Sequence, residues 1–294
     1  MSTTRLSDVT AQVQKFWAPM FVPKLKEDSI LPGLVNRAYE GEIKKKNDTV
    51  YVSALARPTA VIKDTSAADA DVFSTEKMTT TRVPIVANKR ITAAYEVEDL
   101  VDIQSLVGAN ESAVRNGLFE ALQIKLNAFC YGIVSPSTSA PDHTVASVTD
   151  FNASQIGVVR KLASQAKWPK LDAWYLLLDP QYYSDFINAT TMTSSDYVGG
   201  DLPVVRGQFA QKRFNFNILE DNSDGLIGIG TSGQDAALAF HPDFMYLVMQ
   251  QQPTLKISDL HSHKQHGYVV SADLIVGAVL GIEGNVKHIT VINT

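Results

Sequence analysis

Three glycines, Gly228, Gly230 and Gly233, match the G-x-G-x-x-G spacing of loops that bind the pyrophosphate of a dinucleotide. Such a loop needs a buried strand before it, a helix that begins at the third glycine and an acidic residue about twenty positions later. The preceding residues, LEDNSDGLI, are typical of a turn, and Pro242 follows too soon for a helix of useful length. Position 253 is a proline rather than an acid. We therefore interpret the stretch as a turn that leads into a strand, AALAFHP, and predict no nucleotide cofactor.

Three histidines near the end of the chain could together hold a zinc ion. His261 and His263 are two residues apart, and His266 follows three residues later. A catalytic zinc site uses three protein ligands and one open position. The spacing lacks the helical H-E-x-x-H register, and the nearby carboxylates are only Asp259 and Asp273. We interpret the histidines as part of an exposed polar loop and predict no metal site, with a nucleotide- or zinc-dependent enzyme as a remote alternative.

Two further reactive side chains have simple structural interpretations. Cys130 is the only cysteine, so it cannot form an internal disulfide, and it lies beside the apolar face of a predicted helix. We interpret it as a small packed residue rather than a nucleophile. His241 precedes Pro242 and is interpreted as a structural hydrogen-bonding residue. The acidic residues are scattered singly. The sequence therefore predicts no catalytic site, and the chain is not expected to be an enzyme.

Composition excludes several other classes of protein. The 294 residues are 45% hydrophobic and 19% charged, with 26 basic and 31 acidic side chains giving a net charge of −5. The densest basic run, at residues 44–46, is too short for a protein that grips DNA tightly. No window is apolar enough to predict a membrane span, and no secretory signal is expected at the start. The lone cysteine fits a reducing cytoplasm.

The first hundred residues contain apolar segments for which the sequence predicts little local structure. Prolines at 19, 23 and 32 interrupt residues 1–40, which are typical of an arm that packs on something else. Two runs, 48–62 and 89–99, alternate apolar and polar residues as strands do. The polar stretch 63–81 between them is long for a compact domain. It is either a loose hairpin tip or an extended β-arm that becomes ordered only against a neighbour.

The rest of the chain predicts a mixture of helices and strands. Residues 110–133 form the clearest helix, because Val114, Leu118, Leu122 and Leu126 recur at spacings of four. This helix would be about 36 Å long, with Asn110 as its N-cap. Further helices are predicted at 154–166 and 179–189, the latter capped by Asp179. Strands are predicted at 173–179, 216–221, 236–242, 246–252, 267–282 and 288–293. The predicted class is α+β.

Several sequence segments also resemble those of a known family, and they follow the same order as in that family along most of the chain. Residues 32–52, PGLVNRAYEGEIKKKNDTVYV, resemble the N-terminal stretch of tailed-bacteriophage major capsid proteins. Asn47 stands where that family often has glycine, and asparagine also tolerates the left-handed conformation. Residues 87–105 are similar to the family's returning strand and its approach to a long helix. Similar phrases are LLLDPQYYSDF at 176–186, AALAFHPDF at 236–244 and HGYVVSADLIVGAVLGIEG at 266–284.

The resemblance implies the Hong Kong 97-like capsid fold. In that fold residues 1–42 would be an N-terminal arm, and 43–97 an extended β-hairpin loop that lies across a neighbouring subunit. Residues 98–150 would form a peripheral domain with the long spine helix. Residues 151–255 would mainly form the axial domain, and 256–294 would supply strands that return to the peripheral and axial domains.

The resemblance also implies a function and partners. The chain would be a major capsid (coat) protein that self-assembles into pentamers and hexamers of an icosahedral shell around packaged double-stranded DNA. Its partners would be copies of itself, a separate scaffolding protein, a portal and a decoration protein, with non-specific contacts to DNA and none to a membrane. It would be assembled in the bacterial host cytoplasm and reside in the virion. An encapsulin-type nanocompartment shell protein, built on the same fold, is the close alternative.

Overall fold

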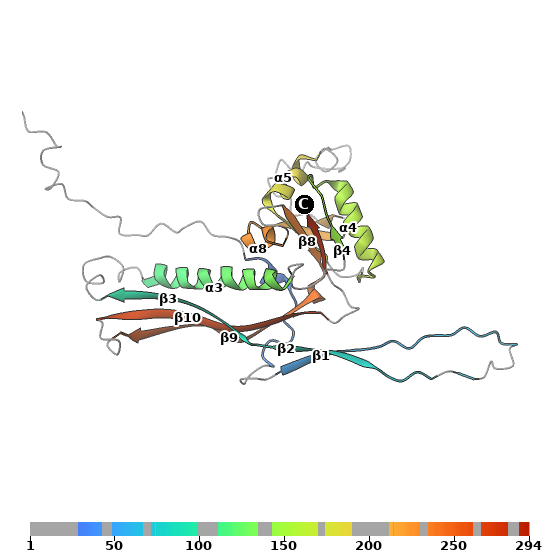
Figure 1. Ribbon diagram of the computed structural model, residues 1–294, viewed down its shortest axis with the longest axis horizontal. Helices are drawn as coiled ribbons and strands as arrows, with labels where there is room; N and C mark the ends of the chain where they lie inside the picture. The colour runs from blue at the N-terminus through green and yellow to red at the C-terminus, as the bar shows by residue number, and fades with distance from the viewer. Residues whose placement is uncertain are drawn as a thin grey trace, which may run out of the picture.

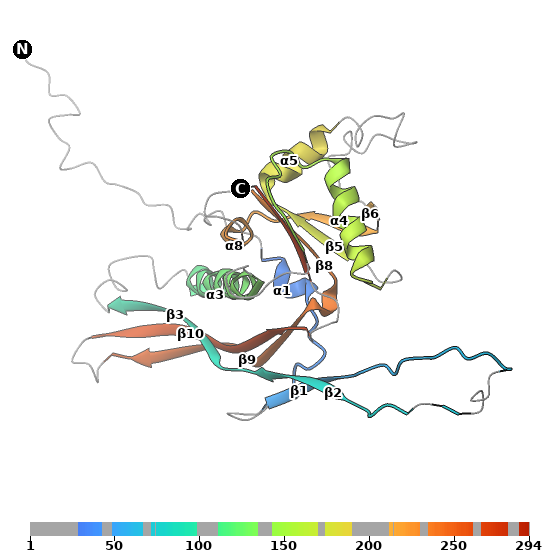
Figure 2. The same ribbon diagram turned by 45° about the vertical axis from the view of Figure 1, so that its right-hand side comes forward.

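The computed structural model describes residues 29–42, 49–66, 72–73, 75–98, 111–134, 143–169, 174–189, 212–213, 215–229, 235–260, 266–281 and 288–293. Its elements form three parts (Figure 1): a six-stranded sheet with helices, a three-stranded sheet covered by one long helix, and a two-stranded hairpin that projects from the body. Figure 2 shows the hairpin extending past the body on one side. None of the helices in the described ranges has the length and apolarity needed to cross a membrane.

The six-stranded sheet has the order β4-β11-β8-β5-β7-β6. Its strands are β4 (His143–Val145), β5 (Trp174–Leu178), β6 (Lys212–Arg213), β7 (Phe216–Glu220), β8 (Ala236–Phe240) and β11 (His288–Ile292). Central β5 pairs in parallel with β7 and antiparallel with β8. Every residue of β8 is buried, which explains the unbroken apolar sequence AALAF. The predicted strands at 173–179, 216–221, 236–242 and 288–293 are thus confirmed.

Two helices accompany this sheet and share a core with it. They are α4 (Ala153–Gln165) and α5 (Pro180–Asn188), both as predicted. The Asp179 side chain accepts a hydrogen bond from the Tyr182 backbone N–H at 3.1 Å, and Pro180 occupies the first turn. The shared core is rich in aromatic side chains: Phe151, Trp168, Trp174, Tyr182, Phe186 and Phe216. Its strong burial makes this sheet and its two helices one packed unit.

The three-stranded sheet is antiparallel, in the order β3-β10-β9. It comprises β3 (Lys89–Glu98), β9 (Met245–Asp259) and β10 (Gly267–Leu280). The long helix α3 (Glu111–Val134) runs along one face of it (Figure 1). Leu118, Leu122 and Leu126 of this helix are buried in the same cluster as Val270 and Leu274 of β10. The long helix predicted at 110–133 is therefore confirmed, while its predicted cap, Asn110, lies outside the described residues.

The hairpin consists of β1 (Thr49–Leu55) and β2 (Thr80–Val86), paired antiparallel. The sequence prediction missed β2, which lies at the end of the polar stretch. It also extended the first strand to residue 62, whereas β1 ends at Leu55. The second predicted strand, β3, pairs with β10 instead of with the hairpin. The prediction for 246–252 was also too short, because pairing with β10 carries β9 as far as Asp259.

Short elements connect these parts. The helix α1 (Leu31–Leu34) packs against α3, and Asn36 forms an isolated bridge with Tyr246 of β9. The 3₁₀ turn η4 (Pro242–Phe244) links β8 directly to β9, so one chain passes from the six-stranded sheet into the three-stranded one. The one-turn helix α8 (Asp224–Ile227) follows β7. These links bring both sheets into contact with α3.

Candidate functional site

The glycine-rich stretch forms a helix end and a close packing contact. Gly228 is the C-cap of α8, and its backbone N–H donates to the Asp224 carbonyl at 3.0 Å. The preceding residues, predicted as a turn, thus include one helical turn. Gly230 and Gly233 lie outside the described residues. The following strand, β8, is where the sequence predicted it, so the expected order of turn and strand is confirmed.

Gly225 of the same stretch lies under the ring of Tyr131 in α3. A β-carbon at this glycine would lie 2.6 Å from Tyr131 Cδ2, so glycine permits the contact. The Tyr131 hydroxyl donates to Asp221 Oδ2 at 2.5 Å, and Asp221 Oδ1 accepts the Ser223 backbone N–H at 2.9 Å. Burial, together with the neighbouring Asp221 charge, raises the pKa of Tyr131 well above its usual range. The contact ties the long helix to the six-stranded sheet and has a structural role.

The carboxylate that could have assisted a zinc site is engaged in a structural ion pair. His261 and His263 lie outside the described residues, and His266 is exposed just before β10. Asp273 Oδ2 in β10 accepts hydrogen bonds from Arg90 Nη2 at 2.6 Å and from Arg90 Nε at 3.1 Å. Its Oδ1 accepts a hydrogen bond from the Thr254 hydroxyl at 3.0 Å. The hydrogen bond from Arg90 is the main cause that lowers the pKa of Asp273. Within the described ranges, no three His, Cys, Asp or Glu side chains are grouped to hold a metal ion.

Cys130 and His241 have the structural roles that the sequence predicted. Cys130 is fully buried in the core beneath α3, and burial raises the pKa of its thiol to about 12. Such a thiol is not nucleophilic at neutral pH. The buried His241 Nδ1 accepts the Asp243 backbone N–H at 3.2 Å, where η4 begins.

An unexpected pair of carboxyl groups lies where β5 meets α5. Asp179 is almost fully buried, and its backbone N–H donates to the Ala236 carbonyl at 3.2 Å, which places it next to the segment that carries Asp235. Burial is the first cause that raises the pKa of Asp179 to about 6, and the charge of Asp235 adds to it. Sequence reasoning identified Asp179 as a helix cap and missed this pair, because Asp235 is far away along the chain. Asp179 is buried, whereas Asp235 is only half-buried.

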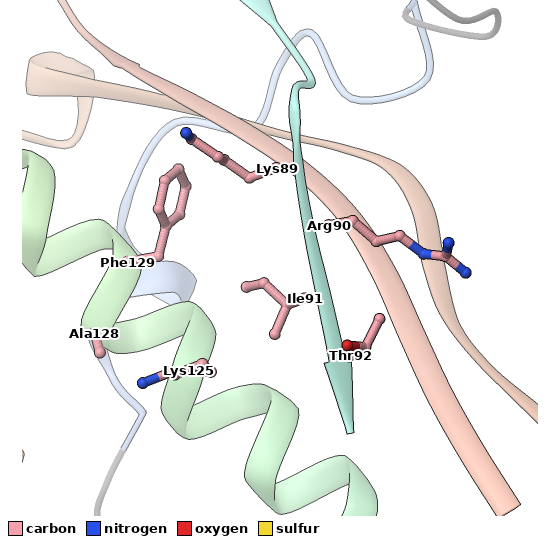
Figure 3. Close-up of a pocket in the computed structure, with 7 residues that line it drawn as sticks. All are labelled: Lys89, Arg90, Ile91, Thr92, Lys125, Ala128 and Phe129. Carbon is pink, nitrogen blue, oxygen red and sulfur yellow. The ribbon is translucent and has the colours of Figure 1, made fainter. Parts of the chain in front are cut away.

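A shallow pocket of about 530 Å³ lies between α3 and β3 (Figure 3). Ile91 and Phe129 form its apolar floor, and the amino groups of Lys89 and Lys125 stand at its rim. Arg90 and Thr92 point away from α3, towards the opposite face of the sheet. Cations beside apolar side chains suit contact with an acidic or apolar group of a partner. The described lining residues offer no acid–base pair or nucleophile.

The hairpin exposes the most conspicuous apolar surface of the described residues. Ile62 is 98% exposed, Phe73 83% and Met78 80%. Further exposed apolar side chains along it are Tyr51, Leu55, Val61 and Val72. Single exposed apolar residues are ordinary, but such a concentration on one projection marks an interaction site. We refer to these seven residues as the hairpin apolar surface.

The hairpin keeps its shape beyond its paired strands through a few cross-links. The Ala56 backbone N–H donates to the Thr79 carbonyl at 2.9 Å. Farther out, the Thr59 backbone N–H donates to Glu76 Oε2 at 3.1 Å, and Lys63 Nζ donates to the Val72 carbonyl at 2.6 Å. These bonds hold the two legs side by side as they extend from the body (Figure 1). The hairpin therefore presents its apolar side chains far from the core of its own subunit.

The fold is shared with solved structures of bacteriophages. The chain is 18% identical to one from Mycobacterium phage Che8, with a TM-score of 0.76 over 95% of this chain and 97% of that one. It is 12% identical to a chain of the capsid of cyanophage P-SCSP1u, with a TM-score of 0.71 over 100% and 96%. A chain of the cyanophage Pam1 capsid asymmetric unit is also 12% identical, with a TM-score of 0.71 over 99% of both chains.

These similarities extend over nearly the whole of each chain. They show that the chain has an α+β fold that is also found in chains of bacteriophage capsids. No protein-family model matches the sequence. No curated protein sequence matches it either.

Proposed function

We propose that the chain is the major capsid protein of a tailed bacteriophage or prophage, and that it self-assembles into pentamers and hexamers of an icosahedral shell. Its fold, which is that of phage capsid proteins, supports the proposal. In such a shell its role is structural rather than catalytic. The Hong Kong 97-like type of the fold, and the division into arm, loop, peripheral domain and axial domain, belong to the same proposal.

The observation that carries the proposal is the hairpin apolar surface. Ile62, Phe73 and Met78 are exposed on a projection that its own subunit does not cover. Burial of such side chains stabilises an assembly by roughly 1.5–3 kcal/mol for each residue fully covered. A subunit that offers one surface and receives a different one makes a heterologous contact, which forms a ring where the rotation from one subunit to the next closes. Pentamers and hexamers are rings of this kind.

The partners follow from this role. The hairpin would lie on a second copy of the chain, and the shell would enclose double-stranded DNA. The net charge of −5 suits a shell lining that does not grip DNA, because a surface that repels phosphate lets packed DNA move. A scaffolding protein, a portal and a decoration protein are further proposed partners, in a virion assembled in the host cytoplasm.

Removal of the hairpin end tests the proposed assembly surface. The Ala56 N–H donates to the Thr79 carbonyl, so residues 57–78 can be replaced by Asn-Gly at a point where the legs already pair. The shortened chain should keep the secondary structure of the wild type by circular dichroism but remain a small species in analytical ultracentrifugation. Assembly of the shortened chain into normal shells would contradict the proposed role of the hairpin.

The contents of the particles separate a phage shell from a compartment shell. Particles purified from the producing cell should hold DNA and carry a portal at one vertex. Particles that hold an enzyme cargo, without DNA or portal, would favour the encapsulin-type alternative.

A further inference from the structure

The hairpin joins the body through a very short junction. β2 ends at Val86 and β3 begins at Lys89, so on this leg of the hairpin only Ala87 and Asn88 lie between β2 and the three-stranded sheet. At the junction the chain passes against β10 (Figure 1). In β10, Val276 pairs with Lys89 of β3, and the next residue, Gly277, pairs with Val248 of β9. The second leg of the hairpin therefore passes into the sheet within a few residues.

Gly277 is buried at the point of closest approach. A β-carbon on Gly277 would lie 2.2 Å from the Val86 carbonyl oxygen, 2.7 Å from the Val86 carbonyl carbon and 2.8 Å from Ala87 Cα. All three are backbone atoms, so no side-chain rotation can relieve the clash. Because non-bonded carbon atoms pack at about 3.5–4.0 Å, the junction would have to retreat by about 1 Å or more.

A small apolar cluster holds the base of the hairpin beside this crossing. Val52 of β1, Ile85 of β2 and Val248 of β9 are buried together. The rings of Tyr39 and Tyr246 pack edge to face at its border, with centroids 5.5 Å apart. The cluster contains residues from both the hairpin and the body, so it clamps the hairpin onto β9 while Gly277 leaves room for the junction.

We infer that Gly277 is a positioning residue: by letting the β2–β3 junction lie against β10, it fixes the direction in which the hairpin projects. A displacement of the base is amplified farther out along the hairpin, where Ile62 and Phe73 lie. The consequence for assembly rests on the proposed shell function, whereas the effect on hairpin direction does not. A side chain at position 277 should therefore change the direction in which the hairpin projects, even in an isolated subunit.

The test measures the hairpin direction in unassembled subunits. Spin labels are attached to Ile62→Cys on the hairpin and Arg160→Cys on α4, both at exposed positions, and their separation is measured by double electron–electron resonance. Cys130 stays unlabelled because it is buried and its thiol pKa is raised to about 12. Adding Gly277→Ala should shift or broaden the distance distribution. An unchanged distribution in a folded Gly277→Ala variant would overturn the inference.

Gly281→Ala is the matched control. Its β-carbon would lie 2.9 Å from the Asp243 carbonyl oxygen, so it strains the end of the same strand at a contact that does not involve the hairpin. This variant should lose thermal stability while keeping the wild-type distance distribution. The same shift in both variants would show a general response to strain and would also count against Gly277.

A second variant covers the case in which Gly277→Ala does not fold. Ala87→Gly adds no atoms but gives the junction more backbone freedom, so it should broaden the label distribution without a clash. A distribution identical to that of the wild type would contradict the inference.

Assembly is scored separately. Gly277→Ala should form fewer closed shells than Gly281→Ala at equal folded concentration. If the wild-type chain itself forms no shells, the proposed function fails, while the label distances still decide the role of Gly277.

Discussion

At the scale of single residues, the polar groups buried inside the subunit serve the fold. Asp179 caps α5 and lies near the charge of Asp235, Tyr131 bonds to Asp221, and Asp273 pairs with Arg90. The cap on α5 was predictable from the local sequence, since Asp179 precedes Pro180. The pairings were not predictable, because each joins residues that are far apart along the chain and meet only in the folded sheet.

The carboxyl pair predicts a dependence of stability on pH. The pKa of Asp179 is raised to about 6 from an ordinary value of 3.8, so folding favours its protonated form. This contribution is fully present below the ordinary pKa and is lost as the pH rises through about 6. Asp179→Asn keeps a capping oxygen without the charge. The variant should therefore be more stable than the wild type at pH 7.5, by about 1–2 kcal/mol, with the difference disappearing near pH 4.

Urea unfolding of the subunit between pH 4 and pH 8 checks this prediction. Asp150→Asn, at an exposed position, is the control and should follow the wild-type curve. If the unfolding free energies of Asp179→Asn and the wild type differ by the same amount at every pH, the raised pKa assigned to Asp179 would be refuted.

The bond between Tyr131 and Asp221 predicts a second stability effect. Tyr131→Phe removes the donor and leaves the buried Asp221 carboxylate with fewer partners, which should cost about 1–3 kcal/mol. Tyr95→Phe, at a residue that is 49% exposed, should change the unfolding free energy by less than about 0.5 kcal/mol. Equal unfolding midpoints in urea for the two variants would show that the Tyr131 bond contributes little.

At the scale of elements, hydrophobic spacing predicted the long helix and most strands, and the errors have physical reasons. β2 was missed because Thr80, Thr81 and Pro84 make it look like a loop. Pro84 is tolerated there because β2 belongs to a two-stranded sheet, where a strand has a free edge. The polar half of β9 was missed because pairing with β10, rather than its own apolar pattern, keeps it extended.

A substitution on the hairpin should change the assembly of shells without changing the stability of the subunit. Phe73→Asp should leave the unfolding free energy of the subunit within about 0.5 kcal/mol of the wild type, because the side chain is 83% exposed. It should nevertheless reduce the yield of shells, since the charge would have to be buried against a neighbour. Thr75→Asp adds the same charge at an adjacent exposed position and is the matched control. Sedimentation of both variants under assembly conditions gives the yields, and equal yields would exclude Phe73 from the contact.

At the scale of the whole molecule, the chain combines a packed body with a projection that the body does not cover. The six-stranded sheet and the helix-covered three-stranded sheet bury their own apolar residues. Among the described hairpin residues, the buried ones lie at its base, where Val52 and Ile85 form a cluster with Val248 of β9. The family resemblance predicted the α+β capsid fold, which the solved phage structures confirm. The hairpin apolar surface itself required the structure, because exposure depends on how β1 and β2 leave the body.

The measurement that tests the central claim most directly is electron microscopy of the purified wild-type chain under assembly conditions, with and without a co-expressed scaffolding protein. The proposed function predicts closed shells built from rings of five and six subunits. A population that stays monomeric in every condition would contradict it.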